Sequence, residues 1–545
     1  MSKPITPKPN NLSAAPIGID FGTTNSVMSR YTHTLLKIGP ENLNFPITGS
    51  NLYPSIAIVD EKKCEIRTGK AASTRKFIEP ENIVSSVKRR IAEDSIYSFN
   101  GTVISNTQIA EAIISGFIKE IKSVDHNFCP NIVIVTVPYY FGENENALIK
   151  QTVENAIEHE TNSAPSFFII PEPVAASISC LYDIKDELLN SKVFFIYDIG
   201  GGTLDMTLVK ITNDLASFSY EVLANDGMLL FGGDDIDQFI YEYVIEHEQL
   251  DFSNLTKHQQ NVNKARLMEE CIEAKHHLSS CESYDFMCPN LLGIEQGYIE
   301  ITITRNKLET IIQGDNRIKR NMLSDMGECI KRLYAKAGIE KESVDYVVPV
   351  GGTSLIPLFK QYIKKLHQNS EELLSNTPND SFVLVANGAS IYGALKSDEI
   401  FKTQYRPFKH QNAIKNMQTR ISHSLYIEKY NGKLDKIVDA NTISPFVFEK
   451  IYYPSKFIDG DNQVDMGHVR LYQGKGESRK NGEFIGNIDF SSYKIYSHGR
   501  SLNDIPIKLK VKVTDSLVFI TVLIPKSDIN KNDIEFSQII YNNKI

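Results

Sequence analysis

The sequence contains no apolar run approaching the about 18–20 residues that span a bilayer, so we expect a soluble protein with no membrane partner. It has no basic excess either, because 58 Lys and Arg stand against 67 Asp and Glu. The net charge of −9 argues against nucleic acid as a partner. Its seven cysteines form no Cys-x-x-Cys pair, and MSKPITPKPNNLSAAP carries no signal peptide. We therefore expect reduced thiols and a cytoplasmic location.

At 545 residues the chain is too long for one core, and its patterning predicts several parts. Residues 1–16 form a Pro-rich polar stretch, which predicts a disordered tail. Between 17 and 396 strand and helix patterns alternate, which predicts an α/β domain. Within it, 131–138 is typical of a buried strand, 108–124 has apolar residues at helical spacing, and 386–396 indicates a closely packed helix of small residues.

The pattern changes after 396. Residues 397–420 are polar, mostly basic and without a clear period, which predicts a linker. From 421 onward the helical patterns stop, and 505–515 alternates apolar and polar residues along a whole strand. We therefore expect 421–545 to be an all-β domain with one solvated face.

Two similar segments each end an apolar strand on an aspartate and follow it with a turn of small residues. They are IGIDFGTTNSV (17–27), with Asp20, and VFFIYDIGGGTLDMTLV (193–209), with Asp198. A β-hairpin alone would explain the glycines, but a carboxylate at a buried strand end is costly unless something positive lies against it. The repeat indicates two halves that are built alike and face each other.

Such a pair of turns suits a triphosphate. Triphosphate binding requires backbone N–H groups and hydroxyls for the phosphate oxygens, and acidic groups to hold Mg²⁺ through water. The two hairpins supply all three. The sequence has no G-x-x-x-x-G-K-[ST] motif, so the site is not a P-loop.

With these motifs the chain resembles the 70-kDa heat-shock chaperones of the actin-like ATPase superfamily. Eight segments match in family order over roughly 17–396: IGIDFGTTNSV, SVKRRI, VIVTVPYYF, IIPEPVAAS, FIYDIGGGTLDMT, FGGDDID, AKHHLSS and VGGTSLIP. The resemblance implies a two-lobed actin-like ATPase domain of α/β class, followed by an all-β, sandwich-like peptide-binding domain. It also implies slow ATP hydrolysis.

The resemblance assigns catalytic and metal roles. Lys88 resembles the family's catalytic lysine, a cation beside the γ-phosphate and the attacking water. Asp20 and Asp198 would hold Mg²⁺ through its waters, and K⁺ is a second candidate ion. The positions that orient the water and its ions are Glu172, Thr203 and Asp205.

The resemblance also assigns a nucleotide site made of two phosphate loops, close-approach glycines and a base pocket. Its residues are Gly22, Thr23, Thr24, Asn25, Gly200, Gly201, Gly202, Thr203, Gly232, Gly233, Lys275, His276, Ser279, Gly351, Gly352 and Leu355. The family often holds the base between two arginines, whereas this chain has His276 and Leu355 there. A leucine can cover one face of a purine, so we expect ATP binding that is weaker and less selective.

In the β domain, Leu425 and Ile427 match positions of the family's peptide pocket, and Tyr430 adds to it. Core packing in a sandwich would explain the same residues equally well. The partners implied are unfolded or extended polypeptide and a J-domain-type co-chaperone or nucleotide-exchange factor. The family binds its peptide by strand-like main-chain bonds.

Three departures bear on how the parts communicate. Asn146 stands where the family has an arginine that relays the nucleotide state. The basic stretch 397–420 replaces a short leucine-rich linker, and the residues after Pro525 are too few for the family's helical lid. A second hypothesis is therefore a nucleotide switch for one dedicated partner. A small-molecule kinase or an actin-like filament protein agrees less well with the C-terminal β domain.

Overall fold

A computed structural model describes the residues in these ranges: 15–34, 37–60, 65–93, 96–99, 102–139, 141–184, 191–213, 218–314, 319–373, 378–401, 403, 405, 416–420, 424–429, 432–439, 442–444, 446–454, 463–464, 468–474, 482–489, 507–513, 518–524 and 534–540. The chain divides into two compact units. The first comprises the described residues within 1–138, 152–218 and 223–414. The second comprises those within 139–151, 219–222 and 415–545. Among these residues, no helix combines the length and apolar character needed to cross a membrane.

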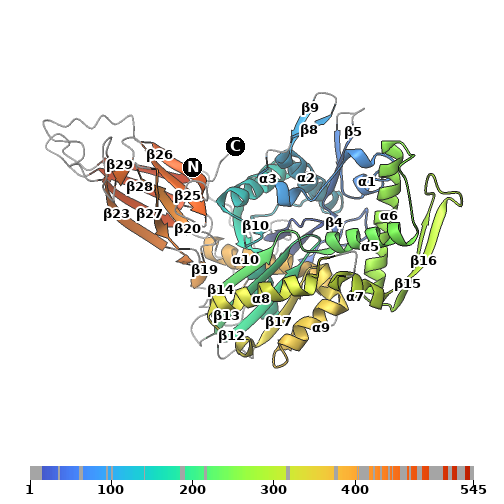
Figure 1. Ribbon diagram of the computed structural model, residues 1–545. Helices are drawn as coiled ribbons and strands as arrows, with labels where there is room; N and C mark the ends of the chain where they lie inside the picture. The colour runs from blue at the N-terminus through green and yellow to red at the C-terminus, as the bar shows by residue number, and fades with distance from the viewer. Residues whose placement is uncertain are drawn as a thin grey trace. The chain divides into compact units, whose positions relative to one another are not determined.

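The main sheets of the first unit repeat one topology (Figure 1). In each, an antiparallel hairpin (β1–β2 or β12–β13) lies beside a parallel strand (β10 or β17), which pairs in parallel with another (β11 or β18). The two halves that the repeated hairpins predict are therefore present. The strands are β1 (Ile17–Asp20), β2 (Asn25–His33), β3 (Ile38–Asn42), β4 (Tyr53–Pro54), β10 (Ile132–Val137), β11 (Ser166–Pro171), β12 (Lys192–Ile199), β13 (Leu204–Asn213), β14 (Phe218–Met228), β17 (Tyr346–Val350) and β18 (Glu371–Glu372).

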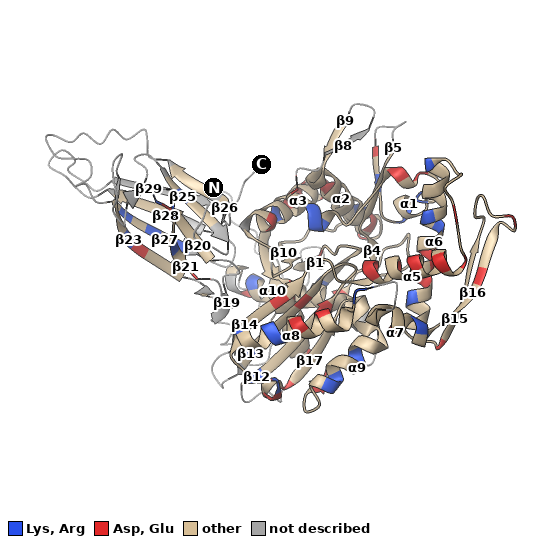
Figure 2. Cartoon of the chain, viewed as in Figure 1, with Lys and Arg blue, Asp and Glu red and all other residues tan. Residues whose placement is uncertain are grey.

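Small sheets and helices surround these two sheets. The small sheets are formed by β5 (Ile56–Asp60), β6 (Glu65–Thr68) and β7 (Ile83–Ser85); β8 (Ile96–Phe99) and β9 (Thr102–Ser105); and β15 (Ser283–Pro289) and β16 (Tyr298–Thr304). The helices are α1 (Gly69–Ser73), α2 (Asn106–Val124), α3 (Glu143–Thr161), α4 (Glu172–Ile184), α5 (Gly233–His247), α6 (Lys257–Leu278), α7 (Arg305–Gln313), α8 (Met322–Ala337), α9 (Pro357–Leu366) and α10 (Pro378–Phe401), with short 3₁₀ turns η2 (Pro80–Asn82), η3 (Val87–Arg90), η4 (Lys341–Ser343) and η5 (Gly352–Leu355). Acidic residues mark α5 and basic residues mark α9 (Figure 2).

The local predictions in this unit are confirmed where periodicity was strong. The strand expected at 131–138 is β10, buried along its whole length. The helix expected at 108–124 is α2, which begins after Ser105 because the Ser105 side chain accepts the Gln108 N–H and the Gln108 side chain accepts the Ser105 N–H. The expected helix of small residues is α10, which packs against α4, β1, β2 and β10.

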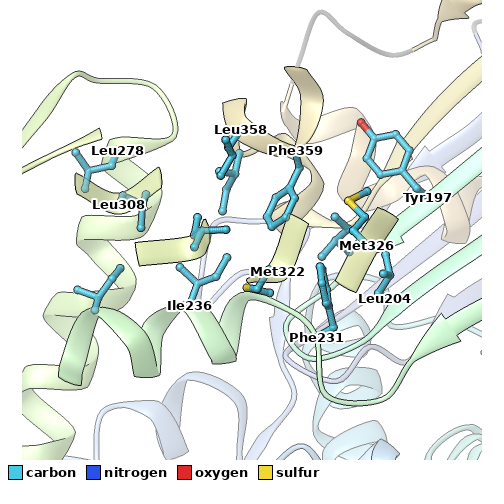
Figure 3. Packing of buried hydrophobic residues seen from close by; sticks show 14 of the residues in the cluster. Tyr197, Leu204, Phe231, Ile236, Leu278, Leu308, Met322, Met326, Leu358 and Phe359 are labelled. Carbon is cyan, nitrogen blue, oxygen red and sulfur yellow. The ribbon is translucent and has the colours of Figure 1, made fainter. Parts of the chain in front are cut away.

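One large core lies on the second sheet and its helices. Tyr197 and Leu204 of the hairpin β12–β13, Phe231, and residues of α5, α8 and α9 point into a common interior (Figure 3). The Phe231 and Phe359 ring centroids lie 6.0 Å apart. This core holds the second hairpin and the start of α5 in place, and both carry candidate site residues.

The expected linker 397–420 is partly folded. Helix α10 continues to Phe401, five residues beyond its predicted end at 396. The Asp398 carboxylate then accepts from the Thr403 hydroxyl and from the Tyr405 backbone N–H, both at 2.7 Å. This turn was not predicted, because Asp398, Thr403 and Tyr405 are separated in sequence and form no periodic pattern.

The second unit contains two sheets around one core. The sheets have the orders β21-β20-β25-β26 and β24-β23-β27-β28-β29. Residues of both pack into a single apolar cluster, so the unit is a sandwich. The strands of these two sheets are β20 (Ser424–Glu428), β21 (Leu434–Val438), β23 (Phe446–Pro454), β24 (Gln463–Val464), β25 (His468–Gly474), β26 (Gly482–Asp489), β27 (Ile507–Val513), β28 (Val518–Ile524) and β29 (Ile534–Ile540). Outside these two sheets, β19 (Asn416–Arg420) pairs with β22 (Ile443–Ser444). The alternation predicted at 505–515 is confirmed by β27.

Candidate functional site

The two glycine-rich turns meet in the first unit. A Cβ atom placed on Gly201 would lie 2.0 Å from the Thr24 hydroxyl oxygen, so the turn after β12 touches the turn after β1. A Cβ on Gly22 would lie 2.0 Å from the Asn25 carbonyl oxygen. Only glycine fits these positions, and the contact between segments far apart in sequence supports a joint binding surface.

The start of α5 closes the second turn from outside. The Gly233 N–H donates to the Gly200 carbonyl at 3.1 Å, and a Cβ on Gly232 would lie 2.5 Å from the Gly202 nitrogen. The Thr353 hydroxyl donates to the same Gly200 carbonyl at 2.8 Å. The glycines predicted at 232 and 233 therefore allow backbone to pack on backbone, which holds the turn rigid.

Gly351, at the end of β17, has a left-handed backbone with φ of 76°. A Cβ on this residue would lie 2.4 Å from Oδ1 of Asp198. Glycine is thus required there for two reasons, the backbone conformation and the space that the carboxylate occupies. The structure brings the Gly-Gly turn at 351–352 directly against the predicted metal residue.

Lys88 is buried and paired with Glu172. Its Nζ donates to Oε1 of Glu172 at 2.5 Å, and the Lys88 residue is 4% exposed. The preceding Ser86 has a left-handed backbone with φ of 56°, unusual outside glycine, which starts the 3₁₀ turn η3 that carries Lys88. Burial lowers the pKa of Lys88, but the carboxylates of Glu172 and Asp20 outweigh it, so the pKa is raised and the ammonium stays charged.

Three further carboxyls, each half-buried like Glu172, share this region. Burial raises the pKa of Asp20 to about 6, although Lys88 opposes the rise. Burial and the neighbouring Glu172 raise the pKa of Asp205 to about 8. Asp198, which pairs with Asp205 across the hairpin, has its pKa raised well above its ordinary value by burial and then by Glu172. The carboxyls outnumber the one buried ammonium among them.

This donor set fits a hydrated divalent cation. Mg²⁺ is bound by carboxylate oxygens, retains several waters, and would relieve the repulsion among these groups. No three acidic, histidine or cysteine side chains in the described part of the chain form a group that could hold a metal ion themselves. That Asp20 and Asp198 would hold the ion through its waters stays a prediction.

Some of the residues predicted to bind the nucleoside form hydrogen bonds within the protein. Lys275 donates to Oδ2 of Asp237 at 2.7 Å and to the Gly233 carbonyl at 3.1 Å, and the Ser279 hydroxyl donates to the Lys275 carbonyl at 2.9 Å. His276 is exposed and Leu355 is partly buried. The Lys275–Asp237 pair was not predicted, because a lysine on one helix and an aspartate on another do not indicate a contact in the sequence.

Arg89, the residue after Lys88, is a further site residue that was not predicted from the sequence. A Cβ on Gly202 would lie 0.8 Å from its Nη2 atom, so the guanidinium covers the second glycine-rich turn. The segment SVKRRI contained this signal, because an arginine follows the predicted catalytic lysine directly.

For the predicted peptide residues Leu425 and Ile427, the structure agrees with core packing, the alternative that the sequence left open. Leu425 is 2% exposed and Ile427 0%, and both belong to the sandwich core. Alternation along β20 directs these side chains to the inner face, so here they fill the core instead of lining an open pocket. Tyr430 lies outside the described residues.

Asn146 lies in α3, where an arginine was expected from the resemblance. Its Oδ1 atom is buried and has no hydrogen-bond partner among the described residues. An amide in this position cannot form the charge-assisted fork of an arginine.

Comparison with known proteins matches this chain to one family. A family model described as "Hsp70 protein" matches residues 93–524. The "Chaperone protein DnaK" of Psychrobacter cryohalolentis is 26% identical over 507 residues, covering 87% of this chain and 70% of the relative.

Proposed function

This chain belongs to the Hsp70 family, a family of chaperone-type ATPases, and from that membership we propose that it binds and slowly hydrolyses Mg²⁺-ATP and binds extended polypeptide. The observation that carries the proposal is the buried Lys88–Glu172 pair beside two touching glycine-rich turns. Phosphoryl transfer to water depends mainly on positioning and on charge stabilisation, which this arrangement supplies.

In the proposed mechanism the turns 22–25 and 200–203 cradle the phosphates. The Lys88 ammonium stabilises charge on the transferred phosphate, and Glu172 holds that ammonium in place. Asp205 and the Thr203 hydroxyl, which are hydrogen-bonded to each other, orient the attacking water. When bound, Mg²⁺ would neutralise phosphate charge. We propose 17–396 and 421–545 as the two domains for this function, joined by 397–420, the first part of which is folded.

The decisive experiment is the ATPase rate with Mg²⁺, with EDTA, and with an added unfolded protein. A Mg²⁺-dependent rate that rises with unfolded protein supports the proposal. A chain that neither binds nor hydrolyses ATP contradicts it. A peptide array separates this proposal from the second hypothesis, a nucleotide switch for one dedicated partner, which Asn146 favours. Binding of many apolar peptides on the array would support the chaperone.

The base pocket provides one prediction. Leu355→Arg should tighten ATP binding by roughly 2–30-fold, because a guanidinium over a purine adds about 0.5–2 kcal/mol that leucine lacks. Competition binding against GTP measures this change, with Leu292→Arg, which adds the same charge at an exposed leucine outside the predicted base pocket, as the control. If the parent strongly prefers ATP over GTP and Leu355→Arg leaves that preference unchanged, the prediction of a weak base pocket at Leu355 is wrong.

A second prediction concerns communication between nucleotide and peptide. Peptide off-rates measured with ATP and with ADP should agree within about tenfold, which is ~1.4 kcal/mol. Coupling needs an element that both ligands bias, and Asn146 removes the relay that the family builds on arginine. Labelled-peptide release timed in each nucleotide tests it. A hundredfold difference would mean that another element has taken over the coupling.

A further inference from the structure

The guanidinium of Arg89 lies against the second glycine-rich turn. A Cβ on Gly202 would lie 0.8 Å from Nη2, 1.6 Å from Cζ and 2.4 Å from Nη1 of Arg89. The three nearest atoms to this position all belong to Arg89, so the guanidinium fills the space that any larger residue at 202 would need. Arg89 follows Lys88 in η3, which places two cations at one end of the site.

Two donors of this guanidinium are unused. Nε and Nη2 of Arg89 are buried and have no hydrogen-bond partner among the described residues. Leaving a buried charged donor unsatisfied is costly, and each such group in a folded protein requires an explanation. The adjacent Arg90 differs, because its Nη2 donates to the Ser85 carbonyl at 2.5 Å.

Acidic groups near Arg89 attract its positive charge, but no described carboxylate accepts a hydrogen bond from its Nε or Nη2. Burial raises the pKa of Asp205 to about 8 and also raises that of Asp234, and the charge of Arg89 opposes both shifts. Long-range attraction therefore favours a cation here. A phosphate group that enters the site would bring both the acceptor oxygens that these donors lack and the negative charge that a guanidinium favours.

We propose that Arg89 binds the terminal phosphates of the nucleotide directly, as a second cation beside Lys88, and that Gly202 is required to seat its guanidinium. The inference rests on the proposed ATP site. A planar fork of donors suits two phosphate oxygens, and a guanidinium supplied by the same chain stabilises charge during phosphoryl transfer.

The test is calorimetric binding of Mg²⁺-ATP, Mg²⁺-ADP and AMP to the full chain and its variants. Arg89→Ala should weaken ATP and ADP by about 10–100-fold, the range for losing hydrogen bonds to a charged group, and should change AMP less than about threefold. Arg89→Lys keeps the positive charge but lacks the planar set of guanidinium donors, so its affinities should lie between those of the parent and of Arg89→Ala. Arg90→Ala removes the same charge from the same turn and should bind all three nucleotides as the parent does.

Gly202→Ala provides an independent measurement, because its methyl group would displace the guanidinium. It should weaken ATP about as much as Arg89→Ala does, and the double variant should be no weaker than either single one. If Gly202→Ala does not fold, the series at 89 and 90 still decides the question.

The outcomes separate this inference from the proposal on which it rests. Arg89→Ala that binds ATP and ADP like the parent, with or without a lower melting temperature, overturns the phosphate role and leaves only a structural one. An equal loss for AMP overturns it too, because AMP lacks the terminal phosphates. A parent chain that binds no nucleotide overturns both inferences, whereas a parent that binds ATP normally confines the failure to Arg89.

Discussion

Lys88→Ala should lower ATP turnover by roughly 10²-fold or more while ATP stays bound, the scale for removing one preorganised electrostatic group. The Lys88 side chain is 4% exposed and its ammonium is bonded to Glu172 at 2.5 Å, so its charge is held in one place. Single-turnover hydrolysis gives the rate, and equilibrium binding gives the affinity. Lys70→Ala, which removes an exposed lysine, is the matched control and should have no effect.

The same substitution also removes positive charge from among half-buried carboxyls. Without Lys88, Glu172 and Asp20 lose their buried cationic partner, so the melting temperature should fall even where the chain remains folded. Rates must therefore be taken at a temperature where the variant is folded. A folded Lys88→Ala protein that hydrolyses ATP as fast as the parent would show that the role given to Lys88 is wrong.

Asp198→Asn should reduce the Mg²⁺-dependent part of ATP binding by about tenfold or more and stabilise the nucleotide-free protein at neutral pH. The first effect follows because an amide lacks the charge that attracts hydrated Mg²⁺. The second follows because burial and nearby Glu172 disfavour ionised Asp198 in the folded state. Binding with and without EDTA measures the first effect, and thermal melting the second.

The pH dependence has a definite sign. A carboxyl whose pKa is higher in the folded than in the unfolded chain favours folding when protonated, so its contribution falls as pH rises from about 4 toward the folded value. For Asp205 that window ends near pH 8, and Asp198 shifts in the same direction. The nucleotide-free parent should therefore lose stability between about pH 4 and pH 8, and Asp198→Asn should lose less.

Melting temperatures at pH 5 and pH 8 test this, with a difference of at least about 2 °C expected between parent and variant. Asp251→Asn is the control, because that exposed carboxyl accepts bonds from Ser253, which lower its pKa. Its removal should not flatten the pH profile. If Asp198→Asn melts like the parent at both pH values, the buried-charge account of this site fails.

The sequence by itself determined the elements whose signals are local. Asp20 and Asp198 at strand ends, each followed by glycine and threonine, predicted two similar hairpins, and both sheets are built around them. Period-two alternation predicted β27, and helical spacing predicted α2. Such features depend on neighbours a few residues apart, which a linear pattern records.

Only the tertiary structure decided which side chains face one another. Lys88 meets Glu172 84 residues later, and Arg89 lies on Gly202, because chain packing brings η3 against α4 and the second turn. Lys275 pairs with Asp237, and Leu425 turns into the sandwich core, for the same reason. The spacing of motifs carries no information on these pairings. Each pairing depends on which distant segment packs against the residue and on how deeply the two side chains are buried there.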